Sequence, residues 1–279
     1  MPSVIFMGRK PGAVVALEHL LARGWDIRFV VTPSGDPAWL PHPTVAEVAH
    51  EAGLPLCPYQ ELLREVEASE SAPDLRQTLA VEWVFCYLFP YRVRASLLDF
   101  PTCGVLNFHP APLPDYGGLG GYNFAIMELR QEYGVTCHYM DEGFDTGDLV
   151  KVARFPMDPG RETALSLEME AQRRLLSLFV EVTTAIEQGL PLPRVPQEGR
   201  TRYINRAQFE AAKAIGDADG PDMVARKARA FWFPPYDGAY MEVAGQRLTL
   251  VATDTLADIA PVVHGAALED LRAFHRGLI

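Results

Sequence analysis

Three polar residues have the types and the spacing that group transfer requires. Asn107 and His109 lie two residues apart at the end of an apolar run, Cys103 to Leu106, that predicts a strand. Residues i and i+2 of a strand point to the same face, so the amide and the imidazole would emerge side by side. Asp145 follows 36 residues after His109, in an acidic stretch with two glycines, Asp141 to Asp148. An amide donor, a titratable imidazole and a carboxylate are the groups that acyl or one-carbon transfer needs.

The elements around these residues predict an α/β fold with a Rossmann-like, mainly parallel sheet. Val4 to Met7 and Asp26 to Val31 are short apolar strands, and Ala13 to Arg23 between them has apolar residues at helical spacing. Such alternation implies crossover connections and parallel pairing. Val81 to Leu88 is a nearly continuous apolar strand, suited to the buried centre of the sheet. Val135 to Met140 predicts the strand that leads into the acidic loop.

The chain as a whole predicts a larger and a smaller part. Residues 191–202 are rich in proline, which cannot continue a helix, and predict a linker. We therefore expect a catalytic domain over residues 1–190 and a small, β-rich C-terminal domain over residues 203–279. The tail, Ala266 to Phe274, predicts an amphipathic helix that would cap the small domain or pair the subunits of a homodimer. The other expected elements are helices at Thr44 to Ala52, Arg94 to Asp99, Asn123 to Gln131, Glu162 to Gly189 and Pro221 to Phe231, and strands at Ala239 to Val243 and Gln246 to Ala252.

Length and composition are those of an ordinary globular protein. The chain has 279 residues, of which 48% are hydrophobic and 22% are charged, enough for a sizeable core. Its longest apolar runs, such as Val81 to Tyr91, are interrupted well short of the ~20 residues of a membrane helix. The first residues lack the basic start of a signal peptide and predict a strand instead. We therefore expect a cytoplasmic protein without a membrane partner.

Charge and cysteine usage exclude further classes of function. The formal net charge of −11 disfavours a nucleic-acid partner, because such a partner needs basic surface to neutralise phosphates. It leaves room for a small anionic substrate, which needs only a local basic pocket. The four cysteines (Cys57, Cys86, Cys103 and Cys137) have no CxxC spacing and lie in apolar runs. This pattern predicts reduced, buried thiols rather than disulfides or zinc ligands, and we expect no bound metal.

The central motif resembles a known family. Asn107-Phe108-His109-Pro110 is followed by Leu113-Pro114 and then by Asp145-Thr146-Gly147. In these motifs the sequence resembles the 10-formyltetrahydrofolate-dependent formyltransferases. Members of this family act on glycinamide ribonucleotide, methionyl-tRNA or nucleotide-linked sugars. The resemblance extends from the first strand to about Val251.

The resemblance implies the formyltransferase fold, 10-formyltetrahydrofolate as co-substrate, and roles for three residues. Asn107 would donate to the formyl oxygen, and His109 would assist proton transfer. Asp145 would hold a water and favour protonation of His109. Without the resemblance, Asn107 and His109 could also be a buried hydrogen-bonded pair, and Asp145 could be an ordinary turn residue.

Two segments would hold the co-substrate if the resemblance is followed further. In the family, the segment after the central strand wraps the pterin, and backbone groups of the acidic loop line its edge. The residues that correspond here are Tyr91, Arg92 and Val93 in the first segment, and Asp141, Glu142 and Gly143 in the second. A turn leading into a helix is the alternative for the first segment, and loop capping or solvation is the alternative for the acidic residues.

A glycine-bounded turn is the first of two candidate acceptor sites. Arg9 and Lys10 lie between Gly8 and Gly12, where a strand gives way to a helix and backbone N–H groups attract anions. The spacing fits neither a Walker loop nor GxGxxG, so a plain tight turn is the alternative to a contact with substrate phosphate or the folate tail.

The glycine-rich stretch from Pro114 to Asn123 is the second candidate acceptor site. Its glycines, including Gly118, permit close approach of a ligand to the backbone, and Tyr122 and Asn123 could recognise a polar acceptor. A flexible loop is the alternative. Many family members have a basic residue where Gly117 stands here, and its absence weakens the methionyl-tRNA interpretation.

The sequence therefore predicts an N-formyltransferase that acts on a primary amine, with a nucleotide-linked amino sugar as the preferred acceptor. Methionyl-tRNA is the first alternative, but residues 203–279 contain eight Lys and Arg against ten Asp and Glu, a net charge of −2 where a tRNA-binding module should be basic. Another small-molecule amine remains open. A formyltetrahydrofolate hydrolase is disfavoured because we expect no regulatory domain before the first strand. A non-enzymatic folate-binding protein is disfavoured because all three catalytic positions are filled.

Overall fold

A computed structural model describes residues 1–35, 41–69, 71, 77, 80–199, 202–253, 255 and 266–278. The strands are β1 (Ser3–Gly8), β2 (Asp26–Val31), β3 (Trp83–Tyr87), β4 (Gly104–His109), β5 (Gly117–Gly118), β6 (Glu132–Tyr139), β7 (Leu149–Pro156), β8 (Tyr203–Ile204), β9 (Tyr240–Val243) and β10 (Gln246–Thr249). The helices are α1 (Pro11–Ala22), α2 (Val45–Glu51), α3 (Tyr59–Ser69), α5 (Ala95–Leu98), α6 (Gly121–Met127), α7 (Ala164–Glu187), α8 (Arg206–Ala212), α9 (Pro221–Ala230) and α11 (Ala266–Arg276).

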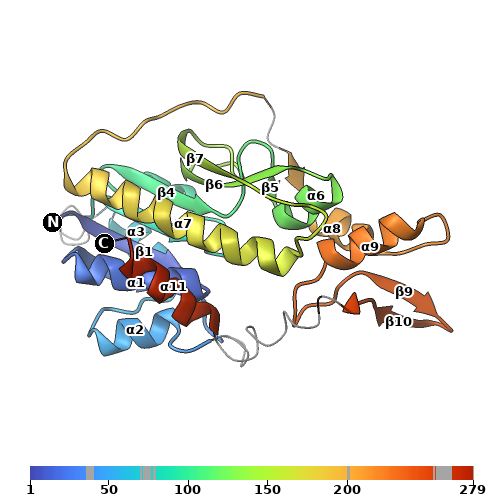
Figure 1. Cartoon of the computed structure of the whole chain (residues 1–279). Coiled ribbons are helices and arrows are strands. Elements are labelled where there is room, and N and C mark those ends of the chain that lie inside the picture. The colour runs from blue at the N-terminus through green and yellow to red at the C-terminus, as the bar shows by residue number, and fades with distance from the viewer. Residues whose placement is uncertain are drawn as a thin grey trace.

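The centre of the molecule is a six-stranded sheet in the order β2-β1-β3-β4-β6-β7 (Figure 1). The first four of these strands are parallel, and β6 and β7 are antiparallel to their neighbours. The predicted α/β fold with a mainly parallel sheet is confirmed. The β7 strand, in which only Val150 and Phe155 are buried, was not predicted; it extends the sheet past the strand that leads into the acidic loop.

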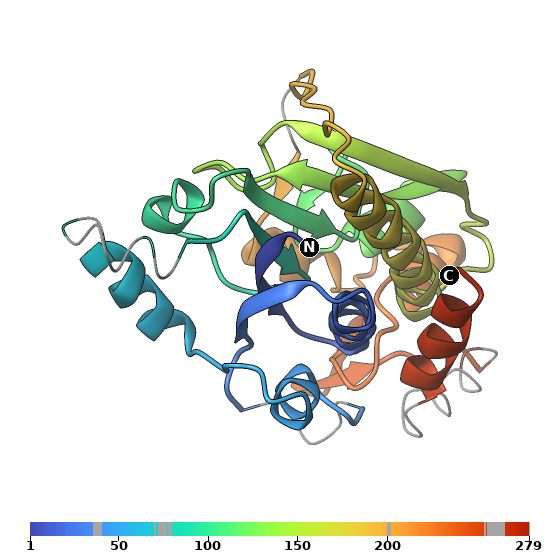
Figure 2. The ribbon, with the colours of Figure 1, turned by 90° about the vertical axis from the view of Figure 1, so that its left-hand side faces the viewer.

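Helices cover both faces of the sheet, and side-chain alternation along the strands explains why (Figure 2). One face of β1, β3 and β4 presents Phe6, Phe85 and Phe108 to α1 and α7, where the Phe108 ring lies 4.8 Å from that of Phe179. The opposite face presents Met7, Val84 and Val105 to α3 and α5. Strands buried on both faces need the continuous apolar sequence that β3 has.

The C-terminal helix α11 returns to the first part of the chain. It packs against α1 and α7 (Figures 1 and 2), where Arg272 pairs with Glu18 and His275 Nε2 lies 2.9 Å from His19 Nδ1. A helix was expected here, but as a cap on the small domain or a subunit contact. Leu271 and Phe274 of this helix pack instead against the core that α1 and α7 share, so the helix belongs by contact to the first part of the chain. The division of the chain at residues 191–202 remains a prediction.

The proline-rich segment, residues 190–199, contacts the sheet through backbone hydrogen bonds. Figure 1 shows it arching from the end of α7 over the β7 side of the sheet toward β8. Val195 exchanges two backbone hydrogen bonds with Leu149 at the start of β7, of 2.8 and 3.0 Å. Beyond residues 200–201, the β8 strand pairs with Gly117 and Gly118 of the glycine-rich stretch.

The cysteines differ in their exposure. Cys57, Cys86 and Cys137 are free and buried as predicted, but Cys103 is exposed because it lies in the turn before β4 rather than in the strand. Within the described part of the chain, no helix is long and apolar enough to span a bilayer. The same residues contain no group of three or more His, Cys, Asp or Glu side chains arranged to hold a metal ion.

Candidate active site

The end of β4 places Asn107 and His109 on one face of the sheet. Leu106 and Phe108 face the α1 and α7 side, so the residues that alternate with them face the other side. His109 is buried, and the chain leaves the strand at Pro110. The predicted placement of the amide and the imidazole on one face follows directly from this alternation.

Asp145 reaches these two residues from a tightly folded loop. Asp141 Oδ1 accepts hydrogen bonds from Gly143 N at 2.9 Å and from Thr146 Oγ1 at 2.7 Å, so Asp141 caps the loop. A Cβ on Gly147 would lie 2.0 Å from Tyr139 O, so no other residue fits there. Asp145 has a φ of 56°, in the left-handed region that non-glycine residues rarely adopt. The loop thus bends sharply and directs the Asp145 side chain inward.

The three predicted catalytic side chains come together around one carboxylate. Asp145 Oδ1 lies 3.5 Å from Asn107 Nδ2 and 3.7 Å from His109 Nδ1. Asp145 Oδ2 accepts a hydrogen bond of 2.9 Å from Gly118 N. The carboxylate is therefore shared between a proton carrier, an amide donor and a backbone donor.

The surroundings of Asp145 keep it ionised. Burial of the carboxyl opposes ionisation, but the nearby His109 charge, the His138 side chain and the Gly118 N–H outweigh it and hold the pKa well below its usual range. The Asp145 side chain is only 16% exposed, so solvent screens these interactions little. A permanent negative charge faces the imidazole.

Asn107, His109 and Asp145 form a polar cluster, and His138 is a fourth side chain of this cluster that was not predicted. It lies opposite Asn107 in the register of β4 and β6, and its Nε2 is 3.0 Å from Asn107 Nδ2. Its Nδ1 lies 2.7 Å from Tyr139 O; since a carbonyl only accepts, Nδ1 carries a proton and Nε2 accepts from the amide. His138 therefore fixes the orientation of the Asn107 amide. Its one signal in the sequence is a titratable residue within an otherwise apolar strand.

The hydrogen bonds of His109 determine where it can carry a proton. Its Nε2 lies 3.0 Å from Tyr116 O, so this nitrogen donates. A second proton can therefore be bound only at Nδ1, the nitrogen that faces Asp145. The geometry permits His109 to take up and release a proton beside a fixed carboxylate.

A groove of about 1400 Å³ lies beyond the carboxyl ends of β2 and β3, on the same side of the sheet as the cluster. Ligands of open α/β sheets commonly bind at these ends. Four of the six predicted co-substrate residues line the groove: Tyr91, Arg92, Val93 and Glu142. The groove does not include the cluster itself; the loop from Glu142 to Asp145 connects the two.

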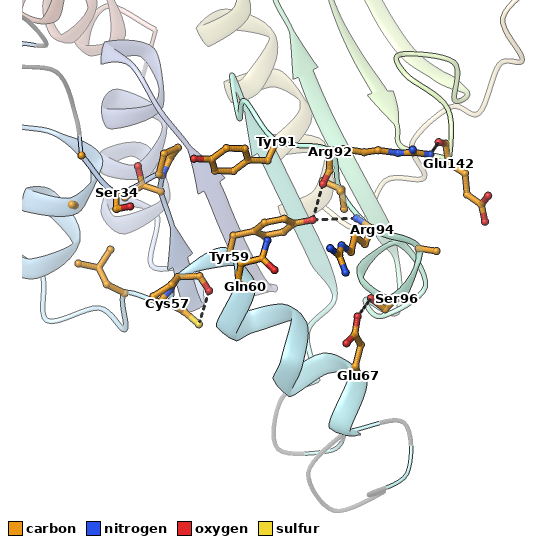
Figure 3. A pocket seen from close by; sticks show the side chains of 18 residues that line it. Ser34, Cys57, Tyr59, Gln60, Glu67, Tyr91, Arg92, Arg94, Ser96 and Glu142 are labelled. Atoms are coloured by element: carbon orange, nitrogen blue, oxygen red, sulfur yellow. Dashed lines mark hydrogen bonds between the residues drawn. The ribbon is translucent and has the colours of Figure 1, made fainter.

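An aromatic pair and arginines line the groove (Figure 3). Tyr91 is 49% exposed, and its ring is stacked on that of Tyr59. The ring centroids are 6.2 Å apart, and the angle between the ring planes is 16°. Arg92 donates to Glu142 O at 2.6 Å and lies over the Phe144 ring, so it joins the wall of the groove to the acidic loop. Of the two remaining predicted residues, Asp141 lines a smaller neighbouring cavity of about 500 Å³, and Gly143 lies in the loop turn.

The predicted acceptor residues divide into separate groups. The Lys10 ammonium lies 2.9 Å from Glu168 Oε1 and over the Phe233 ring, beside the start of α1, while Arg9 N donates to Tyr87 O. Gly118 belongs to the cluster through its bond to Asp145.

Tyr122 and Asn123 pack inward rather than toward an open site. The Tyr122 ring lies 5.6 Å from that of Tyr133, and its hydroxyl pKa is raised well above the usual value by burial. Asn123 is buried, and its amide donates to Ala230 O at 2.6 Å. Since this bond ties α6 to α9, the structure provides a packing partner where the sequence suggested an acceptor contact.

Comparison with known proteins agrees with this arrangement. The family model described as formyl transferase matches residues 8–183. Methionyl-tRNA formyltransferase of Rhizorhabdus wittichii is 30% identical over 272 residues, which cover 96% of this chain and 84% of the relative.

Solved structures are similar in fold at lower identity. An N-formyltransferase from Helicobacter canadensis, solved with folinic acid and dTDP-3-aminofucose, has a TM-score of 0.69 at 20% identity and covers 89% of this chain and 86% of its own. A 4-N formyltransferase from Francisella tularensis has a TM-score of 0.72 at 16% identity, with 90% and 97% covered. With the family model matching more than half of its length, this chain belongs to the formyl transferase family.

Proposed function

We propose that this protein transfers a formyl group from 10-formyltetrahydrofolate to a primary amine. The observation that carries the proposal is the meeting of Asn107, His109 and Asp145 at the carboxyl ends of the sheet, next to a large groove. These three side chains supply the donor, the proton carrier and the fixed charge that formyl transfer needs.

The reaction replaces one carbon–nitrogen bond of the formyl group with another. The acceptor amine attacks the formyl carbon, and the bond from that carbon to the donor nitrogen breaks. One Asn107 N–H is used by His138, and the other makes only a long contact of 3.5 Å with Asp145 Oδ1. The formyl oxygen would replace that contact as negative charge develops on it. His109 would accept the proton that the attacking amine loses and deliver it to the departing nitrogen. Asp145 stabilises the positive charge that His109 carries between these steps.

The groove has the size and chemistry for a folate. 10-Formyltetrahydrofolate has a pterin ring and glutamate carboxylates, and it would supply the formyl group when bound. The stacked Tyr59 and Tyr91 offer an aromatic surface, and Arg92 and Arg94 offer partners for carboxylates. Its volume of about 1400 Å³ exceeds the ~300–1000 Å³ of typical ligand sites, as a long co-substrate requires.

For the acceptor we propose a nucleotide-linked amino sugar. Two observations support this class over tRNA: the similarity of nearly the whole chain to solved sugar N-formyltransferases, and the acidic balance of the molecule, including the net charge of −2 over residues 203–279. The 30% identity to a methionyl-tRNA formyltransferase makes methionyl-tRNA the second candidate.

An amine screen with 10-formyltetrahydrofolate tests both statements. Tetrahydrofolate release would be followed with TDP-, UDP- and GDP-linked amino sugars, with methionyl-tRNA and without any amine. We expect release that depends on an amino sugar. Formylation of methionyl-tRNA alone would overturn the acceptor class, and formate release without an amine would overturn transfer in favour of hydrolysis.

A further inference from the structure

Gln197, in the proline-rich segment, is bonded to the loop that carries Asp145. Its side-chain nitrogen, Nε2, donates to Asp145 O at 2.9 Å and to Gly147 O at 2.8 Å. A carboxamide has two N–H groups, so this one side chain can hold both carbonyls at once. These two hydrogen bonds, one of which joins residues 52 positions apart, both go to backbone carbonyls of the loop.

The backbone conformation of the loop at Asp145 requires stabilising contacts from outside the loop. Asp145 has a φ of 56°, in the left-handed region that non-glycine residues adopt at a cost in backbone strain. Such a conformation persists only where surrounding contacts enforce it. Rotation of the Asp145 backbone would move the carboxylate away from His109, because the side chain follows the Cα.

Gln197 is itself anchored close by. Val195, two residues earlier, is paired with Leu149 by two backbone hydrogen bonds, so the segment is fixed to the start of β7. On the other side of residues 200–201, Ile204 of β8 pairs with Gly118, whose N–H holds Asp145 Oδ2. Residues on both sides of positions 200–201 thus restrain Asp145. Gln197 holds its backbone carbonyl, and β8 pairs with Gly118, which holds its carboxylate.

We propose that Gln197 is a positioning residue for formyl transfer, which holds the Asp145 backbone in the conformation that places the carboxylate against His109. This inference rests on the proposed function for its effect on rate. It assigns a role to a segment that the sequence identified only as a linker.

Two substitutions isolate the hydrogen bonds of Gln197. Gln197→Met has a similar length without donors, and Gln197→Glu has nearly the same shape with oxygens facing two carbonyls. Glu198→Ala, at the exposed neighbouring residue, is the control. We expect kcat to fall on the order of 10- to 100-fold in both Gln197 variants, as for a misplaced catalytic group. KM should stay within about threefold because Gln197 does not line the groove.

The Glu variant supplies a readout that a general loss of packing would not change. A protonated carboxyl has one O–H donor, whereas the ionised form has none. The rate of Gln197→Glu relative to Gln197→Met should therefore rise as the pH falls from 8 to 5. A ratio that is flat over this range would contradict a role for the hydrogen bonds.

Hydrogen exchange separates this inference from the proposed function. Amides of the loop from Asp141 to Leu149 should exchange at least about fivefold faster in both Gln197 variants than in Glu198→Ala. If the wild-type protein transfers no formyl group, the proposed function fails, but exchange still decides whether Gln197 holds the loop. Unchanged exchange, or a kcat within twofold of the control, would overturn the positioning role.

Discussion

At the residue scale, Asp145 uses its two oxygens for different tasks. Oδ1 faces the Asn107 and His109 side chains, whereas Oδ2 is occupied by the Gly118 N–H. The backbone donor fixes the carboxylate at one oxygen and leaves the other to face the reacting groups. Asp145 is therefore placed to compensate a protonated imidazole without accepting the proton itself.

Asn107→Ala should abolish most of the activity while preserving the fold. Removing one oxyanion donor typically lowers kcat by ~10²–10³. The lost bond to His138 should lower the free energy of unfolding by only about 1 kcal/mol. Tetrahydrofolate release and urea unfolding measure the two effects.

The matched control for this change is Asn205→Ala. Asn205 caps α8 through Gln208 N, so its loss should cost about 1 kcal/mol of stability with little change in kcat. Equal turnover by Asn107→Ala and Asn205→Ala would contradict the role of the Asn107 amide.

Asp145→Asn should remove a pH-dependent part of the stability. The folded-state pKa of Asp145 lies below its ordinary value of 3.8, so the ionised group stabilises the fold at all pH values above that. This contribution is lost as the pH falls below 3.8 toward the folded-state value. The unfolding free energies of wild type and Asp145→Asn should differ by about 2 kcal/mol from pH 5 to 7, and the difference should shrink steadily as the pH falls below 3.8. A difference that does not change with pH would show that the carboxylate is not specifically stabilised.

At the element scale, α11 is joined to α1 by a chain of hydrogen bonds with a defined proton order. Thr183 donates to Phe179 O, so its hydroxyl oxygen accepts from His19 Nε2 at 3.2 Å. His19 Nδ1 must then accept from His275 Nε2, which requires a neutral His19. A proton on His19 Nδ1 would set two donors against each other and weaken the docking of α11.

The docking of α11 should therefore weaken in acid. Burial, followed by the His275 charge, lowers the pKa of His19 from 6.5 to about 4, with Glu187 acting in the opposite direction. The unfolded chain binds more protons than the folded one between these values, so stability falls as the pH drops from 6.5 to 4. The loss should be at most about 3 kcal/mol, measured by unfolding across this range.

Two variants check that His19 causes this loss. His19→Phe removes one titrating group and should reduce the dependence of stability on pH between 4 and 6.5, while the lowered pKa of His275, caused by burial, leaves a smaller part of it. His50→Gln, at an exposed residue of α2, should retain it. Equal slopes in the two variants would assign the acid sensitivity to other groups.

At the scale of the whole molecule, we expect the net charge to disfavour tRNA as a partner. The net charge of −11 gives a polyanion long-range repulsion rather than attraction, whereas a small anion meets only local groups. We expect methionyl-tRNA to show no saturable binding below about 10 μM at 0.15 M salt, measured by fluorescence anisotropy. Tight binding, with a slope of log K against log salt steeper than about −3, would support the tRNA interpretation instead.

Much of the fold and the heart of the site could be predicted because the signals are local. Apolar alternation and helical spacing span a few residues, and they located β1, α1, β3, β4 and α7 in the sequence. The short spacing of Asn107 and His109 places them on one face in any strand. The α3 and β7 elements were missed because their patterns are weaker, with charged residues interleaved.

Residue types and local spacing, with the family resemblance that they carry, determined the formyltransferase family and the α/β fold, and they predicted the trio of Asn107, His109 and Asp145. Only the tertiary structure decided which residues support that trio and which element covers α1. His138 and Gln197 become partners of the site through pairing across 31 and 52 residues, and His19 meets His275 across 256. Strand register and the path of the chain set such contacts. Neither produces a periodic pattern of residues in the sequence, so local patterns could not predict them.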